Sequence, residues 1–143
     1  MRRMIVVAAV VLAPAVVLAQ APQFLNTNPQ STAPFSSAVR VGNMLYLAGQ
    51  LGTDHGKLVD GGIGPETKQA LTNIKTVLEA NGSDMDHVVK CTVFMADMKE
   101  WPAMNDVYRT MFTAGKFPAR SAFGTTGLAL DARTEIECLA VVK

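Results

Sequence analysis

The residues best suited to chemistry in this sequence are an arginine and a glutamate in its last third. Arg120 lies in the segment Phe117–Ser121, and Glu135 follows in Thr134–Glu137. We expect the two residues to lie on neighbouring strands. A guanidinium binds a carboxylate through two parallel hydrogen bonds, and a nearby carboxylate can hold a water molecule and transfer protons. The pair therefore indicates a pocket for a small organic acid on which water acts.

Five blocks of the sequence have the order and spacing of one known protein family. The blocks are Phe117–Ser121, Glu135–Glu137, Gly42-Asn43 leading into Ala48–Gln50, Val88–Phe94 and Asn105–Tyr108. Together they resemble the Rid family (reactive intermediate deaminases, also called YjgF-like proteins), and the resemblance covers nearly all of residues 34–142. Several blocks in order are far more specific than one motif, so the sequence is identified as a member of this family.

The resemblance implies a fold, an assembly and a reaction. The fold is the chorismate-mutase-like α+β fold, and the assembly is a homotrimer whose sheets form a central barrel with active sites between subunits. The reaction is hydrolytic deamination of 2-imino acids and their enamine tautomers to 2-oxo acids and ammonia. We expect no cofactor and no metal, because a protonated imine is already electrophilic and the site mainly supplies orientation.

The resemblance also implies roles for individual residues. Arg120 binds the substrate carboxylate, Glu135 positions the water and relays protons, and the backbone carbonyl of Ala122 contacts the same water. Asn105 and Gly49 lie near the ligand. From the residues alone, a structural role stays open for each of the three. Arg120 could be an exposed strand residue or half of a structural ion pair, Glu135 part of a solvated strand face, and Asn105 a helix-surface amide.

Three positions depart from the pattern of active family members. Phe35 replaces a tyrosine whose hydroxyl faces the pocket, Ala48 replaces a serine found in many relatives, and Ala122 replaces a cysteine. The cysteine acts through its backbone carbonyl, which Ala122 retains. The lost hydroxyls favour an alternative function, a non-catalytic module that binds a carboxylate metabolite or acts as a chaperone, whereas Glu135 argues against it.

The first nineteen residues have the pattern of a secretory signal peptide. Arg2 and Arg3 form a basic start, an uncharged apolar run follows, and Ala19 is a suitable cleavage position. The apolar run is shorter than the ~20 residues of a membrane-spanning helix and contains Pro14. We therefore expect a periplasmic or secreted protein that begins at Gln20 and does not interact with the membrane after cleavage.

The remaining chain has the size and charge of one small soluble domain. We divide it into a polar, extended N-terminal arm at residues 20–35 and a single Rid-like domain at residues 36–143. Without Arg2 and Arg3, the 13 basic residues become 11 against 12 acidic ones, a formal charge of −1. A nucleic-acid binder usually carries a basic patch, and no run of basic residues remains after residue 19, so we expect no nucleic-acid partner. A ribonuclease function, known for some family relatives, is therefore the least favoured.

The apolar periodicity predicts five strands and two helices in the order β-β-α-β-α-β-β, with both helices on one face of the sheet. Gly42-Asn43 is typical of a hairpin turn, and the glycine-rich segment 53–64 should be a loop. The expected strands are 38–41, 44–48, 88–95, 120–125 and 133–142, and the expected helices run from Pro65 to about residue 80 and over 100–114.

Cys91 and Cys138 are the only cysteines, and their spacing matches no zinc motif. Export would permit a disulfide. Strand alternation places both side chains under the helices, opposite to Glu135. Strand register is not set by the sequence, so we favour two buried thiols over a disulfide.

Overall fold

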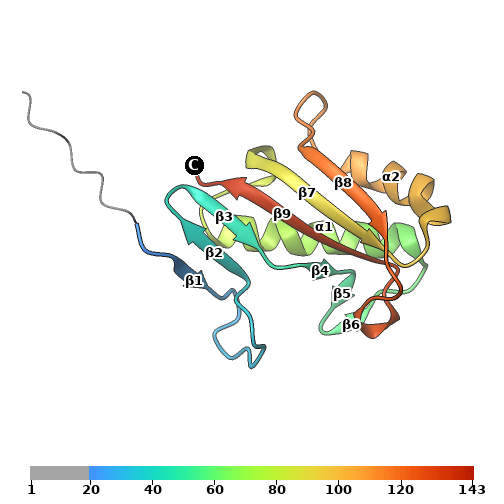
Figure 1. The fold of residues 1–143 in the computed structure, drawn as a ribbon, viewed down its shortest axis with the longest axis horizontal. Coiled ribbons are helices and arrows are strands. Elements are labelled where there is room, and N and C mark those ends of the chain that lie inside the picture. Colours follow the sequence, from blue (N-terminus) through green and yellow to red (C-terminus); the bar gives the residue numbers. More distant parts are fainter. Residues whose placement is uncertain (1–19) are drawn as a thin grey trace, which may run out of the picture.

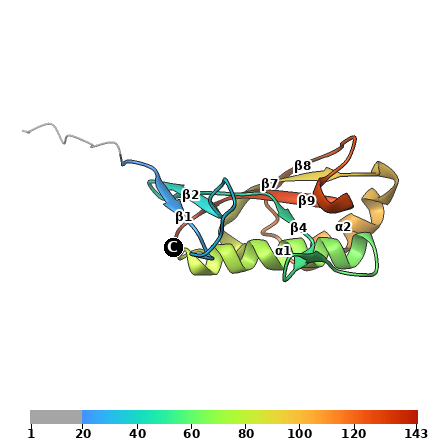
Figure 2. The same ribbon diagram turned by 90° about the horizontal axis from the view of Figure 1, so that it is seen from below.

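Helices α1 (Ile63–Ala80) and α2 (Trp101–Thr110) pack on one face of a sheet in the computed structural model, which describes residues 20–143 (Figure 1). Figure 2 shows both helices on the same side of the strands. The sheet has seven strands in the order β1-β2-β3-β9-β7-β8, and β4 pairs with β9 beyond the end of β3. These strands are β1 (Gln23–Leu25), β2 (Ala38–Val41), β3 (Met44–Leu47), β4 (Gln50–Leu51), β7 (Val88–Met95), β8 (Ala119–Gly124) and β9 (Thr134–Val141).

The expected α+β architecture is confirmed. The predicted hairpin forms between β2 and β3, with Gly42 at a φ of 62° that favours glycine. Helix α2 connects β7 to β8, which run parallel at the edge of the sheet, whereas β9 is antiparallel to both β3 and β7. Pro65 lies in the first turn of α1, and Asn81 follows its last residue as the sequence predicts.

Several short elements were not predicted from the sequence pattern. β1 lies in the N-terminal arm and pairs with β2. The segment 53–64 is not an open loop, because β5 (Thr53–Asp54) and β6 (Lys57–Leu58) form a small hairpin and α1 begins at Ile63. Helix α2 ends at Thr110, before the expected residue 114, and is preceded by a 3₁₀ turn at Met98–Glu100.

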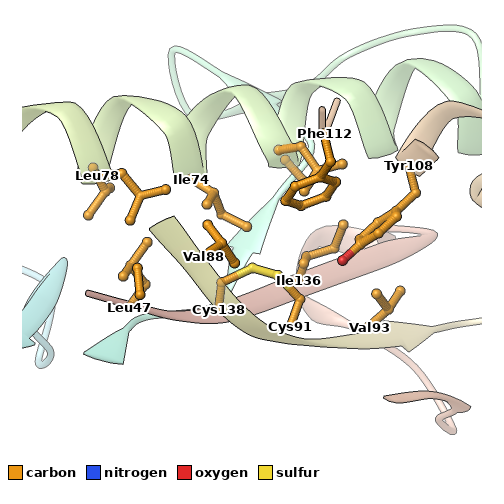
Figure 3. Close-up of a cluster of buried hydrophobic side chains, with 14 of the residues drawn as sticks. Leu47, Ile74, Leu78, Val88, Cys91, Val93, Tyr108, Phe112, Ile136 and Cys138 are labelled. Atoms are coloured by element: carbon orange, nitrogen blue, oxygen red, sulfur yellow. A yellow bond between two sulfur atoms is a disulfide. The ribbon is translucent and has the colours of Figure 1, made fainter. Parts of the chain in front are cut away.

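The core lies between the sheet and the two helices. Helix α1 contributes an apolar face at helical spacing, and every second residue is buried along β9 and, from Cys91 onward, along β7. Figure 3 shows these side chains interleaved between the helices and the strands. Fully buried members of this core are Ala38, Leu45, Ala70, Leu71, Ile74, Leu78, Cys91, Val93, Met95, Met104, Ile136, Cys138 and Ala140.

Cys91 and Cys138 form a disulfide in this core, so the favoured prediction of two free thiols is wrong. The two residues are direct partners on the antiparallel strands β7 and β9, with 4.1 Å between their Cα atoms. Both side chains point toward α1, which confirms the expected shared layer (Figure 3). The sequence could set the face of each cysteine but not the register that aligns them.

The expected signal peptide at residues 1–19 lies outside the described residues. Within residues 20–143, none of the helices is both long enough and apolar enough to span a membrane.

Candidate active site

Arg120 lies in a cradle formed by one face of α2. Trp101, Asn105 and Tyr108 follow each other at the i, i+4, i+7 spacing that places side chains on one helix face. Arg120 Nη2 donates a 2.9 Å hydrogen bond to Asn105 Oδ1. Its Cζ atom lies 4.5 Å from the Tyr108 ring centroid and 5.7 Å from that of Trp101. Cation–π attraction and the amide contact therefore fix the guanidinium in position.

Tyr108 supplies an apolar floor beneath this guanidinium. The residue is only 3% exposed, and its hydroxyl is buried without a hydrogen-bond partner among the described residues. Burial raises the pKa of the Tyr108 hydroxyl to about 12, although the charge of Arg120 acts in the opposite direction. Tyr108 therefore stays neutral at physiological pH and does not act as an acid or a base there.

A cavity of about 210 Å³ opens beside Arg120, between α2 and the segment that leads into β8. It is lined by Asn105, Tyr108, Arg109, Phe117, Pro118 and Arg120. Asn105 accepts one hydrogen bond from the Arg120 guanidinium. Within residues 20–143, the other guanidinium N–H groups have no acceptor, so they are available to a ligand. The cavity thus has the charge and the donors to bind a small carboxylate.

Glu135 lies on the face of the sheet that points away from the two helices. Its neighbours Thr134 and Ile136 point into the core, so alternation turns the Glu135 side chain away from the helices. The carboxylate rests against Gly49, because a Cβ atom added there would lie 2.9 Å from Glu135 Cδ and would overlap Oε1. Only glycine at residue 49 therefore permits this position of the carboxylate.

The remaining predicted residues are Phe35, Ala48 and Ala122. Phe35 is 63% exposed and precedes β2, and Ala48 donates its backbone N–H to the Ser37 carbonyl oxygen at 3.0 Å. Ala48 directly precedes Gly49, the residue that contacts Glu135. Ala122 follows Arg120 by two residues on β8 and shares its face of the sheet.

The predicted site residues therefore form two groups that do not meet within one chain. The Arg120 group comprises Arg120, Asn105 and Ala122. The Glu135 group comprises Glu135, Gly49 and the adjacent Ala48. Phe35 is exposed and belongs to neither group. Cys91 is the register partner of Arg120, and Cys91 points toward the helices, so Arg120 does as well. The expectation that the strands of Arg120 and Glu135 are neighbours is wrong, because β7 lies between β8 and β9.

Three residues around Arg120 were not singled out from the sequence as site residues. Tyr108 and Arg109 line the cavity, and the Trp101 ring lies beside the guanidinium. The i, i+4, i+7 spacing around Asn105 is the signal that could have indicated the cradle. Within residues 20–143, no group of three or more His, Cys, Asp or Glu side chains is placed to hold a metal ion.

Comparisons with known proteins give a consistent result. Residues 25–142 match the family model described as Endoribonuclease L-PSP. The chain is 47% identical over 115 residues to a goat protein named 2-iminobutanoate/2-iminopropanoate deaminase, an alignment that covers 79% of this chain and 83% of the goat protein. The human protein of the same name is 41% identical over the same shares of each chain. The crystal structure of the YjgF gene product from E. coli superposes with a TM-score of 0.78 at 31% identity, over 85% of this chain and 99% of that one.

Proposed function

Because the chain belongs to the endoribonuclease L-PSP family, the family of the Rid proteins, we propose that it hydrolyses 2-imino acids and their enamine tautomers to 2-oxo acids and ammonia. The goat and human relatives carry the name of this activity. The observation that carries the proposal is the fixed guanidinium of Arg120 at the mouth of a cavity, held by Asn105 and Tyr108. Such a group binds the carboxylate that all 2-imino acids share.

The proposed site is completed by a second copy of the chain. Arg120 and Glu135 point to opposite faces of the sheet, so one chain presents two half-sites. β8 is the terminal strand of the sheet and is open to a neighbour along its free edge. A homotrimer in which the Arg120 group of one subunit meets the Glu135 group of the next would form three complete sites.

In the proposed mechanism, the two half-sites divide the work. Arg120 binds the substrate carboxylate and orients the imine carbon, while the neighbouring Glu135 and the Ala122 carbonyl hold a water molecule. Glu135 accepts a proton as the water oxygen adds to the imine carbon, and the proton is delivered to nitrogen. The carbon–nitrogen bond then breaks, ammonia leaves and the remaining C–OH group loses its proton to become the 2-oxo group.

Freshly generated 2-iminopropionate is the substrate that tests this function. Arg120→Ala should lose about 2–5 kcal/mol of binding free energy, which lowers kcat/KM by at least about 30-fold. Arg120→Lys should fall between wild type and Arg120→Ala, because it keeps the charge and loses the planar fork. Turnover by Arg120→Ala at the wild-type rate would reject the assigned role.

Subunit mixing tests whether the site is shared. Arg120→Ala and Glu135→Gln chains should each keep only a small fraction of the wild-type activity when alone. In rings refolded from an equal mixture, about one site in four should combine an intact arginine with an intact glutamate and regain activity. If both residues act within one chain, the mixture should be no more active than the separate variants.

A non-catalytic carboxylate-binding or chaperone-like module is the second candidate. Phe35 and Ala48 favour it, because neither supplies the side-chain hydroxyl that active relatives present to the ligand. The double change Phe35→Tyr and Ala48→Ser should raise deaminase activity if the site is a weakened form of the family site. Ligand binding without turnover before and after the double change would favour the binding module.

We further propose that the mature protein begins at Gln20 and acts in the periplasm or outside the cell. The disulfide between Cys91 and Cys138 supports this location, since disulfides persist in oxidising compartments. Mass spectrometry of the fractionated protein tests it. An intact Met1 on protein from the cytoplasm would contradict export.

A further inference from the structure

We propose that helix α1 positions the catalytic carboxylate through two polar side chains, Asn73 and Glu66, each of which holds one of the two strands that meet at Glu135. The inference rests on the proposed function for the role of Glu135. It assigns Asn73 and Glu66 as positioning residues, because both act through the backbone of β4 and β9 and neither belongs to the Arg120 or the Glu135 group.

The carboxylate depends on a very short strand. β4 contains only Gln50 and Leu51, which pair with Ile136 and Glu135 on β9. Strands in globular proteins usually have five or six residues, so two pairs alone give little resistance to a shift. Such a shift would move Gly49 against the carboxylate that rests on it. The position of Glu135 therefore needs a second support for β4.

Asn73 provides this support from the middle of α1. Its Nδ2 atom donates to the carbonyl oxygens of Leu51 at 3.1 Å and Thr53 at 2.9 Å, on both sides of Gly52. Its Oδ1 atom accepts a 2.9 Å hydrogen bond from Gln69 Nε2, which fixes the orientation of the amide. Both donors of the amide are thus used on the backbone of the segment that contains β4.

Glu66 holds the start of β9 from a position two turns nearer the start of α1. It is 4% exposed, and Oε2 accepts a 2.8 Å hydrogen bond from the backbone N–H of Arg133, two residues before Glu135. The Arg133 side chain stays within 3.9 Å of the same carboxylate and also pairs with Glu100. This charge is therefore buried with a cationic partner and a backbone donor, as a buried carboxylate requires.

The backbone itself brings the two anchors together. A Cβ atom added at Gly52 would lie 2.5 Å from the Cα and carbonyl oxygen of Glu66, so β4 and α1 are in direct contact there. Asn73 follows Glu66 by seven residues, which is two helical turns on the same face. One rigid helix thus fixes the β4 segment and the start of β9 relative to each other.

The experiment compares Asn73→Ala with wild type, using 2-iminopropionate as the substrate. A small misplacement of a catalytic group can cost two orders of magnitude in rate, so we expect kcat to fall by about 10- to 100-fold. KM should stay within about twofold, since the carboxylate is bound by the other half-site. Thr76→Ala is the matched control, because Thr76 is an exposed residue of the same helix and should leave both constants unchanged.

A double variant distinguishes positioning from general damage. In a Glu135→Gln background, Asn73→Ala should lower kcat no further, because the group that it positions is already disabled. Independent, multiplying losses in kcat would overturn the inference. Glu66→Gln keeps an acceptor for the Arg133 N–H, so we expect a smaller loss of kcat than in Asn73→Ala, and a larger loss would contradict the assigned contact.

Hydrogen exchange separates this inference from the proposed function. The β4 and Glu135–Ile136 amides should exchange faster in Asn73→Ala than in wild type, while β7 amides keep their protection. Unchanged exchange at β4 would overturn the inference whatever the activity. A wild-type protein without deaminase activity would reject the proposed function, and the exchange result would then still decide whether Asn73 anchors β4.

Discussion

Loss of the Cys91–Cys138 disulfide should destabilise the fold by an amount set by the loop that it closes. The two cysteines are 47 residues apart in the sequence. In the chain-entropy treatment, closure of a loop of this length lowers the conformational entropy of the unfolded chain and is worth about 4 kcal/mol at 25 °C. This is a large share of the ~5–15 kcal/mol that stabilises a typical domain.

Urea unfolding with and without reductant measures this difference. With a urea dependence of about 2 kcal/mol per molar, the midpoint should fall by roughly 2 M when the bond is reduced. Both samples must have the same protein concentration, since an oligomer gains stability with concentration. The reductant must be present during unfolding, because both cysteines are buried in the native core.

The double variant Cys91→Ala, Cys138→Ala is the control. It should unfold near the midpoint of the reduced wild type and should not respond to reductant. Coincident wild-type midpoints in the two conditions would refute the argument. A second refuting result would be two free thiols per chain, titrated in exported protein that was denatured without reductant and kept from air.

Three further variants test single contacts. Tyr108→Phe removes a buried hydroxyl that has no hydrogen-bond partner among the described residues but keeps the ring under Arg120, so thermal stability should be equal or higher and activity should be retained. Tyr108→Leu removes the ring, so KM should rise through the loss of about 0.5–2 kcal/mol of cation–π attraction. Hydrogen bonds from His87 and Lys143 hold the pKa of Asp84 well below its ordinary value, so their stabilising effect is complete at neutral pH and is lost as the pH falls below about 4. Asp84→Asn should therefore lower the unfolding midpoint at pH 7, and its difference from wild type should close in acid.

Local patterns in the sequence predicted the long elements well. The β-branched run at Val88–Met95, the Gly42-Asn43 turn and the apolar face of α1 each specify their structure through neighbouring residues. The strands β1, β4, β5 and β6 have only two or three residues, too few for an alternating pattern to be recognised. Their pairing depends on distant partners, such as Asn73 for the segment around β4.

The two errors about the site have one physical cause, which is that strand order and register are set by tertiary packing. Alternation placed Cys138 opposite to Glu135 correctly. It could not show that Cys91 aligns with Cys138 on one side and with Arg120 on the other. That alignment forms the disulfide, and it also turns Arg120 toward α2 and away from the face of Glu135.

Opposite orientation of the two half-sites also restricts the assembly that the proposed reaction allows. A two-fold dimer formed through the β8 edge would bring identical surfaces together and place one Arg120 group near the other. A head-to-tail contact instead presents the Arg120 group of one chain to the Glu135 group of the next, and repetition of that contact closes a ring when the rotation permits. The trimer implied by the family resemblance is an assembly of this second kind. The division of Arg120 and Glu135 between the faces of one sheet is therefore what the proposed shared site requires of each chain.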